Sequence, residues 1–448
     1  MRRALTGSLL GLMVLLIAAP AAHAQSTLLD ALLGALAGLF ATPPVAPPPP
    51  PVAPPPVAPP PVAPPPVAPP PPGSVSPTYH GINGQFLWDP SIVGVGAATE
   101  TFRTAQLQAI RGEGLTLLRH GAPWSLIEPV APVGTAHAYQ WGYADTVAST
   151  LARKGVRWYP ILGAPPVWAS GAPPPPLGCP LAFAAPTPGA VAAFAAFAGA
   201  FAARYGPNGA FWRANATLPT LPVQQIELFN EPNVGCSFNT GADDAPARYG
   251  EVYAVARTAI RAAVPATLVV SGGLASGAAN ASTRLVEAKA FVVRMIAARP
   301  TLAAQLDALG LHPYAPDADQ TFAQIAAMRS AVNAATPGRV VPIEVTEAGW
   351  FTQGSIPGDF WGIVPPITEA QRATMLKRLA TELPASDCTV TRFIPHTWIS
   401  PELDPLSFAD WFGIVSRTGV EKPSAIAYGA GIAAARGATV TQPLVRCP

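Results

Sequence analysis

The chain has 448 residues, a formal net charge of +2, and only 12% charged residues, against about 25% in an average domain. There is no basic field to attract nucleic acid and no polybasic patch to hold a membrane surface. Carboxylates are so scarce that one placed at the end of a predicted strand is conspicuous.

The first 24 residues are predicted to be a signal peptide. Arg2 and Arg3 give a basic start, residues 9–19 form an apolar run, and Ala22-His23-Ala24 is a small-x-small cleavage site. The alternative is a membrane anchor, but the run is short for a span of about 20 residues. We therefore expect a secreted protein, extracellular or associated with the cell envelope.

Two further segments precede the predicted domain. Residues 25–42 are mostly apolar, which suits either a short helix that docks on a membrane surface or partner, or a weakly ordered segment. Residues 43–77 are proline-rich and repeat Val-Ala-Pro-Pro-Pro, which predicts an extended polyproline II spacer with a rise of ~3.1 Å per residue. The alternative for this linker is a proline-rich ligand for another domain.

Residues 78–448 have the composition of one globular domain. Strand-like runs alternate there with helical runs such as 245–264 and 369–383, the second preceded by a capping box formed by Thr368 and Gln371. This alternation predicts an α/β fold, a single (β/α)8 TIM barrel. The rival, a doubly wound sheet, lacks a glycine-rich turn after its first strand. The expected strands are 79–86, 115–119, 157–162, 225–230, 268–271, 308–312, 343–346 and 392–398.

The active site of such a barrel lies at the carboxyl ends of its strands. Glu231 ends the fourth predicted strand and Glu347 ends the seventh, and these ends face each other across the barrel mouth. Hydrolysis of a glycosidic bond needs two carboxyl groups, one to protonate the leaving oxygen and one to attack the anomeric carbon or activate water. Arg119, His120, His312, Tyr314, His396 and Trp398 also lie on or after predicted strands.

The domain resembles the clan of (β/α)8 glycoside hydrolases, most closely families 39 and 5. The resemblance is carried by Asn230-Glu231-Pro232-Asn233, by Thr346-Glu347-Ala348-Gly349-Trp350, by Leu311-His312-Pro313-Tyr314 and by supporting segments along nearly the whole domain. It implies that Glu231 is the acid/base and Glu347 the nucleophile of a retaining enzyme, with the carboxyl groups ~5–5.5 Å apart.

The resemblance also implies roles for neighbouring residues. Asn230 would bind the sugar 2-hydroxyl, Tyr314 would hydrogen-bond near the nucleophile, and His312 would support the catalytic groups. Arg119 would orient Glu347, the alternative being an ion pair with Glu227 inside the barrel. We further expect Trp398 and Trp168 to be sugar platforms, and His120 and His396 to contact the substrate. Glu227 is expected to be structural. Glu344 is expected to face the helices, because its strand parity differs from that of Glu347.

Four cysteines after a signal peptide indicate two disulfides, for which three connectivities are possible. Cys179 and Cys236 follow adjacent predicted strands, while Cys388 precedes the last strand and Cys447 is next to the chain end. The strand order therefore favours Cys179–Cys236 and Cys388–Cys447.

We thus expect a secreted, monomeric, retaining glycoside hydrolase without metal or cofactor, endo-acting on an extracellular or cell-wall polysaccharide or oligosaccharide. Two alternatives stay open, a non-catalytic carbohydrate-binding barrel and a transglycosylase.

Overall fold

The computed structural model describes residues 75–93, 97–171, 173–177, 179, 183–354, 366–438 and 447. The predicted signal peptide, the apolar segment 25–42 and residues 43–74 of the predicted linker lie outside the described residues.

The strands are short and pair in parallel, as a five-stranded sheet β1-β2-β3-β4-β5 and a four-stranded sheet β6-β7-β8-β9. Their ranges are β1 Ile82–Asn83, β2 Leu117–Pro123, β3 Arg157–Gly163, β4 Gln225–Leu228, β5 Leu268–Ser271, β6 Leu274–Ala275, β7 Leu309–His312, β8 Ile343–Val345 and β9 Val390–Phe393.

Parallel bridges close the two sheets into one ring. Val270 of β5 pairs with Ala308, and His80 pairs with Phe393 of β9. β5 and β6 are separated only by Gly272 and Gly273, so together they count as one of the eight strands of the barrel. The prediction of a (β/α)8 barrel is confirmed.

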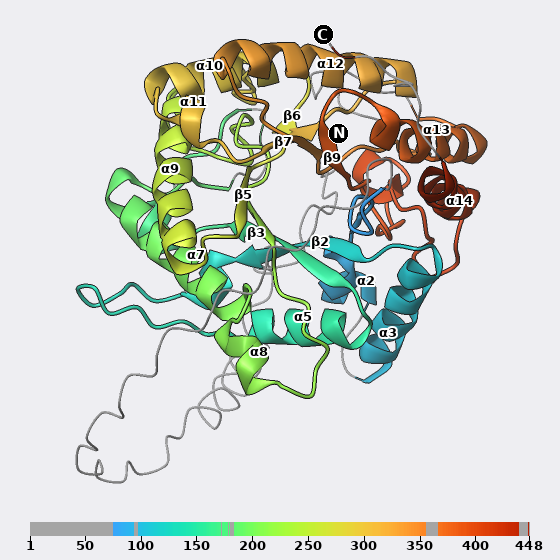
Figure 1. Ribbon diagram of the computed structural model, residues 1–448, viewed down its shortest axis with the longest axis horizontal. Coiled ribbons are helices and arrows are strands. Elements are labelled where there is room, and N and C mark those ends of the chain that lie inside the picture. Colours follow the sequence, from blue (N-terminus) through green and yellow to red (C-terminus); the bar gives the residue numbers. More distant parts are fainter. Residues whose placement is uncertain are drawn as a thin grey trace, which may run out of the picture. The chain divides into compact units, whose positions relative to one another are not determined.

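Helices form a ring around these strands (Figure 1). They are α2 Pro90–Val93, α3 Ala97–Gly112, α4 Trp124–Ile127, α5 Gly142–Arg153, α6 Val167–Ser170, α7 Val191–Tyr205, α8 Ala210–Ala214, α9 Ala245–Ala263, α10 Ala288–Ala298, α11 Leu302–Gln305, α12 Ala318–Ala335, α13 Glu369–Glu382 and α14 Pro423–Gly437. α9 and α13 match the predicted helices, and Thr368 and Gln371 form the predicted capping box of α13.

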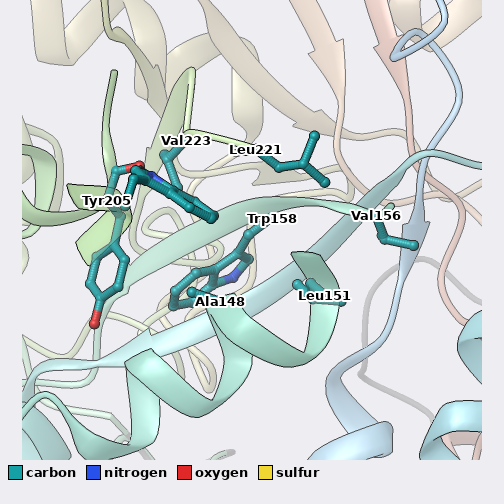
Figure 2. A pocket seen from close by; sticks show the side chains of 8 residues that line it. Ala148, Leu151, Val156, Trp158, Tyr205, Leu221 and Val223 are labelled. Atoms are coloured by element: carbon teal, nitrogen blue, oxygen red, sulfur yellow. Dashed lines mark hydrogen bonds between the residues drawn. The ribbon is translucent and has the colours of Figure 1, made fainter. Parts of the chain in front are cut away.

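The core has two layers. A small apolar cluster fills the barrel interior, and a much larger one lies between strands and helices. The stretch Pro188–Ala214, which contains α7, is long and apolar enough to cross a membrane by composition, but 61% of its apolar window is buried in the fold. Its apolar face is therefore accounted for by core packing. A narrow gap in this layer, between α5 and β3, has no room for a water molecule (Figure 2).

Several strands end earlier than predicted. β1 spans two residues and is followed by a 3-10 helix at Gln85–Trp88. β9 ends at Phe393, so His396 and Trp398 lie on the loop beyond it, and β8 ends at Val345, before Glu347. These early ends decide where several predicted site residues point.

Candidate active site

Arg119 of β2 is the centre of a buried hydrogen-bond network at the carboxyl end of the barrel. Its Nε donates to Glu227 Oε2 over 2.6 Å, and Nη2 donates to Glu227 Oε1 over 2.9 Å and to Asn230 Oδ1 over 2.8 Å. Nη1 donates to Glu347 Oε1 over 2.6 Å and to Asn83 Oδ1 over 2.9 Å. All five guanidinium N–H donors are used. Arg119 therefore makes both contacts that the sequence interpretations require, one with Glu347 and one with Glu227.

Backbone turns beyond β4 bring Glu231 to the network. Phe229 and Glu231 have left-handed φ values of 64° and 47°, which are uncommon for residues with a Cβ. The Glu231 N–H donates to Gly273 O over 3.1 Å, which secures this turn. A carboxylate oxygen of Glu231 lies within 4.8 Å of one of Glu347. The two glutamates therefore meet across the barrel mouth.

The surroundings of Glu347 favour its ionised form. Tyr314 Oη donates to Glu347 Oε2 over 2.7 Å, and Nδ1 of His312 and of His396 each lies 3.8 Å from that oxygen. Burial opposes ionisation, but the two histidines when protonated, the Arg119 guanidinium and the Tyr314 hydrogen bond outweigh it and hold the pKa of Glu347 well below its usual range. At neutral pH Arg119 and Tyr314 are the groups that stabilise the carboxylate.

Glu231 is shifted in the opposite direction. Burial first, and then the negative charge of Glu347, raise the pKa of Glu231 well above its usual range. His312 Nδ1 lies 2.9 Å from Glu231 Oε1, and its Nε2 lies 3.1 Å from Thr346 Oγ1. One buried carboxyl group is thus kept protonated beside one kept ionised.

The histidines are neutral at neutral pH. Burial lowers the pKa of His312 to about 4 and also lowers the pKa of His396. Arg119 is therefore the permanent cation of the site at that pH. Glu231, His312 and Glu347 are close enough for a metal ion by distance, but a dication there would face this guanidinium, and His312 Nδ1 is already within hydrogen-bond distance of Glu231. The donor set thus does not fit a metal ion.

Glu227 and Glu344 both lie inside the barrel. Glu227 accepts from Arg119 and from the N–H of Gly273, over 2.8 Å for the latter. The expectation that Glu344 faces the helices is wrong, because its carboxylate accepts from Tyr159 Oη, over 2.7 Å, and from Gln225. Strict alternation would have placed Glu344 and Glu347 on opposite sides. It fails because β8 ends at Val345.

Two predicted substrate contacts lie away from the carboxylates. His120 is buried, with Nε2 2.6 Å from Tyr143 Oη on α5 and its ring 4.5 Å from that of Trp88. It follows Arg119 on an extended strand and so points to the opposite side, toward the helices. Trp398 is also wrong as a sugar platform, because it is fully buried and its Nε1 donates to Gln106 of α3 over 2.9 Å.

Trp168 and Asn230 keep part of their surface exposed. Trp168, on α6, packs edge-to-face on Trp124 at 5.1 Å and donates to Glu128 O over 3.1 Å. These contacts place it among the loops after β2 and β3, on the face of the barrel that carries the site. Asn230 accepts from Arg119 through Oδ1, which directs its Nδ2 donor elsewhere.

Asn83 and Thr346 belong to the network, although the sequence predicted no role for either side chain. Asn83 accepts from Arg119 and donates to Thr346 O over 3.0 Å, while Thr346 Oγ1 lies 3.3 Å from Glu227 Oε1. Gly273 was also missed, and a Cβ there would lie 2.0 Å from His312 Nε2. The available signal for Asn83 was its position in the first strand, where it is in register with Arg119.

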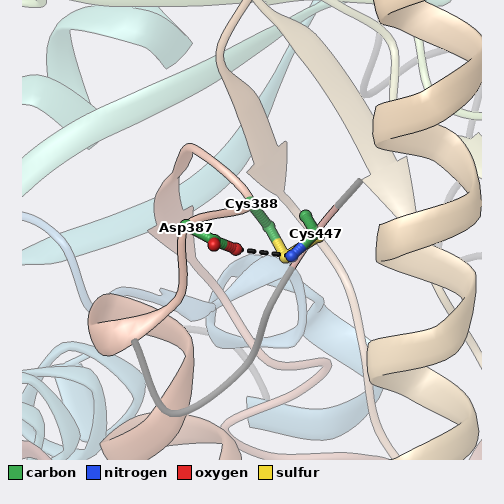
Figure 3. Close-up of side chains that lie close together, drawn as sticks. All are labelled: Asp387, Cys388 and Cys447. Carbon is green, nitrogen blue, oxygen red and sulfur yellow. Dashed lines mark hydrogen bonds between the residues drawn. A yellow bond between two sulfur atoms is a disulfide. The ribbon is translucent and has the colours of Figure 1, made fainter. Parts of the chain in front are cut away.

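The structure contains both predicted disulfides, Cys179–Cys236 and Cys388–Cys447. The second ties Cys388, two residues before β9, to Cys447 near the chain end, and the Cys447 N–H donates to Asp387 (Figure 3). Asp387 and these cysteines also lie close enough to hold a metal ion by distance. The disulfide removes both thiolates, so this cluster does not fit one.

Neither a scan against protein-family models nor a search of curated proteins finds a match. Solved structures do match. A family 39 glycoside hydrolase from Bacteroides cellulosilyticus WH2 has a TM-score of 0.53 at 18% identity, over 80% of this chain and 64% of that one. A monomeric β-xylosidase from Caulobacter crescentus CB15 has 0.55 at 18%, over 80% and 68%.

A fungal β-1,4-galactanase has a TM-score of 0.51 at 15% identity, over 79% of this chain and 99% of that one. The fold is that of the (β/α)8 glycoside hydrolases. The chain spans less than two thirds of the Bacteroides enzyme but nearly all of the galactanase.

Proposed function

We propose that this protein is a retaining glycoside hydrolase. One observation carries the proposal: a carboxylate oxygen of Glu231 lies within 4.8 Å of one of Glu347, and the pKa values of the two groups are shifted in opposite directions. So close an approach of two carboxylate oxygens supports a retaining pair, with carboxyl groups about 5–5.5 Å apart, over an inverting pair, whose groups stand about 6.5–9.5 Å apart with a water between them.

In the first step Glu347, held ionised, attacks the anomeric carbon. As the C–O bond to the leaving group breaks, Glu231 gives its proton to the departing oxygen, so the leaving sugar departs as an alcohol. The products of this step are a glycosyl ester on Glu347 and an ionised Glu231.

The second step reverses these roles. Esterification removes the negative charge of Glu347, which had raised the pKa of Glu231. Glu231 then takes a proton from water as the water oxygen attacks the anomeric carbon, and the ester bond breaks to return Glu347 as a carboxylate. The anomeric configuration is retained because it is inverted twice.

The remaining polar groups support this chemistry. Asn230, fixed by Arg119, is placed to bind the 2-hydroxyl, a contact that strengthens in the transition state. Tyr314 and Arg119 hold opposite oxygens of Glu347 and so fix its direction of attack. His396, close to Glu347 and Phe412, borders the same site and is placed to contact the sugar.

The proposed substrate is an extracellular or cell-wall polysaccharide or oligosaccharide, attacked within the chain by a monomeric, secreted enzyme. Export is supported by the predicted signal peptide and by the two disulfides, which persist in oxidising compartments. The predicted proline-rich spacer would let the barrel reach a polymer while residues 25–42 hold a membrane or cell surface.

The test is a hydrolysis screen on β-linked polysaccharides with wild type, Glu231→Gln and Glu347→Gln. Glu251→Gln on α9 is the matched control. Wild type and control should cleave a glycan that both site variants leave intact, and the product lengths separate endo from exo action. Cleavage that persists in both site variants would overturn the assignment, and binding without turnover would point to a carbohydrate-binding barrel.

Azide rescue then separates the two roles. With an activated glycoside, azide should restore turnover to Glu231→Ala with a glycosyl azide of retained configuration. It should restore Glu347→Ala with the inverted product. The opposite stereochemistry would exchange the roles of the two glutamates.

A further inference from the structure

A cavity lies close to the loop that carries Glu231. It has a volume of about 680 Å³ and lies between residues 235–246, which follow β4 and lead into α9, and residues 279–286, which precede α10, with Arg294 of α10 at its side. That volume is in the range of pockets that bind small molecules. We call it the lateral cleft.

The lateral cleft and Glu231 are connected by a short stretch of backbone, residues 231–235. Gly235 and Val286 line it, and the Val286 N–H donates to Asn233 O over 2.8 Å. Asn233 is two residues beyond Glu231, and Gly235 is four beyond, a reach of at most about 14 Å. A glycan held at Glu231 is therefore within a short distance of the cleft.

The cleft is rigidly built. A Cβ at Gly235 would lie 2.8 Å from Thr283 O and from Arg284 Cβ, so glycine allows the two loops to meet. Asn239 Oδ1 lies 3.4 Å from Arg284 Nη1, and Asn239 Nδ2 donates to Pro174 O over 2.9 Å. The Cys179–Cys236 disulfide secures the same wall.

Charge is the feature that suggests a ligand. Arg284 and Arg294 line the cleft together with one carboxylate, Asp243. In the part of the chain that the structure describes, no carboxylate lies within 4.0 Å of either arginine. Arginine presents a fork of donors that matches a carboxylate. Two such unneutralised groups in one walled cleft favour an anionic occupant.

We propose that the lateral cleft is a subsite for an acidic sugar, a uronic-acid unit of the glycan whose carboxylate is recognised by Arg284 and Arg294. The inference rests on the proposed function and specifies its substrate class. A glycan bound at Glu231 would extend toward Gly235 to enter the cleft, and Asp243 would repel its carboxylate toward the arginines.

The test is binding of an oligosaccharide that carries glucuronic acid, compared with its carboxyl-reduced counterpart, to the secreted protein. Wild type should prefer the acidic sugar by about tenfold or more, since hydrogen bonds to charged groups contribute about 1.5–3 kcal/mol, and salt should weaken that preference. Arg284→Gln/Arg294→Gln should abolish it. Arg294→Gln alone, on an exposed helix position, should reduce it, and Arg153→Gln at the exposed end of α5 should not.

Equal affinity of wild type for the two oligosaccharides, or an unchanged preference in folded arginine variants, would overturn the subsite. The experiments distinguish failure of the subsite proposal from failure of the proposed function. Hydrolysis of neutral glycans without acidic preference removes the subsite alone. Acidic preference without hydrolysis of any glycan removes the proposed function and leaves the subsite.

Discussion

Arg119 and Glu227 form a two-pronged ion pair inside the barrel, with Nε–Oε2 at 2.6 Å and Nη2–Oε1 at 2.9 Å, and both side chains are fully buried. The same guanidinium then reaches Glu347. Glu227 is thus placed to act on Glu347, the proposed nucleophile, through Arg119.

Glu227→Gln should destabilise the fold by about 3–5 kcal/mol, because it removes a charge from a buried pair. It should also lower kcat more than it raises KM, since Arg119 loses its orientation. Denaturant unfolding and steady-state kinetics measure the two effects. Glu344→Gln is the matched control, because Glu344 is equally buried but is held by neutral donors, Tyr159 and Gln225. Equal effects in both variants would contradict a special role for Glu227.

Tyr314→Phe should shift one limb of the pH–rate profile. The lost hydrogen bond favours ionised Glu347, so its removal raises the pKa of Glu347. Activity requires ionised Glu347, and it falls as pH drops through that pKa. The acid limb should therefore move to higher pH. The alkaline limb, which follows the raised pKa of Glu231, should stay in place.

Tyr143→Phe serves as the control for Tyr314→Phe, because Tyr143 contacts His120 outside the site. Its acid limb should match that of wild type. An acid limb that does not move in Tyr314→Phe would show that the hydrogen bond does not govern Glu347.

Substitutions of Trp398 and Trp168, both predicted from the sequence to be sugar platforms, should differ in their effects on stability and on KM. Trp398→Phe leaves Gln106 Oε1 without its donor and should cost about 1–3 kcal/mol of stability, with KM unchanged. Trp168→Ala, at the half-buried residue on the face of the barrel that carries the site, should raise KM for oligosaccharides with a smaller loss of stability. Thermal unfolding and KM, measured on both variants, test this difference. A raised KM for folded Trp398→Phe would show that Trp398 contacts the sugar after all.

The two disulfides should differ in effect. Cys388→Ser/Cys447→Ser opens a loop of 59 residues and should cost about 2–4 kcal/mol with KM unchanged, because the bridge lies at the chain end. Cys179→Ser/Cys236→Ser should lower stability similarly and also raise KM, since it frees a wall of the lateral cleft. Unfolding and kinetics of the two variants, compared side by side, test this difference.

The sequence by itself determined the barrel, the capping box of α13, the disulfide pairs and the meeting of Glu231 with Glu347. These follow from local patterns: strand and helix periodicity, and short motifs at successive strand ends, which a parallel barrel brings to one face. The direction of the His120 side chain, toward the helices, was also predictable in principle, because His120 follows the inward-facing Arg119 on an extended strand.

Only the tertiary structure decided the rest. Side-chain alternation holds while a strand stays extended, and β8 and β9 end before Glu347 and Trp398. The direction of each residue then depends on contacts with distant segments, such as Gln106 for Trp398. The hydrogen-bond partners of Arg119 could likewise not be predicted from local patterns. Asn83, Glu227 and Glu347 are far apart in sequence, and only closure of the barrel places them around one guanidinium.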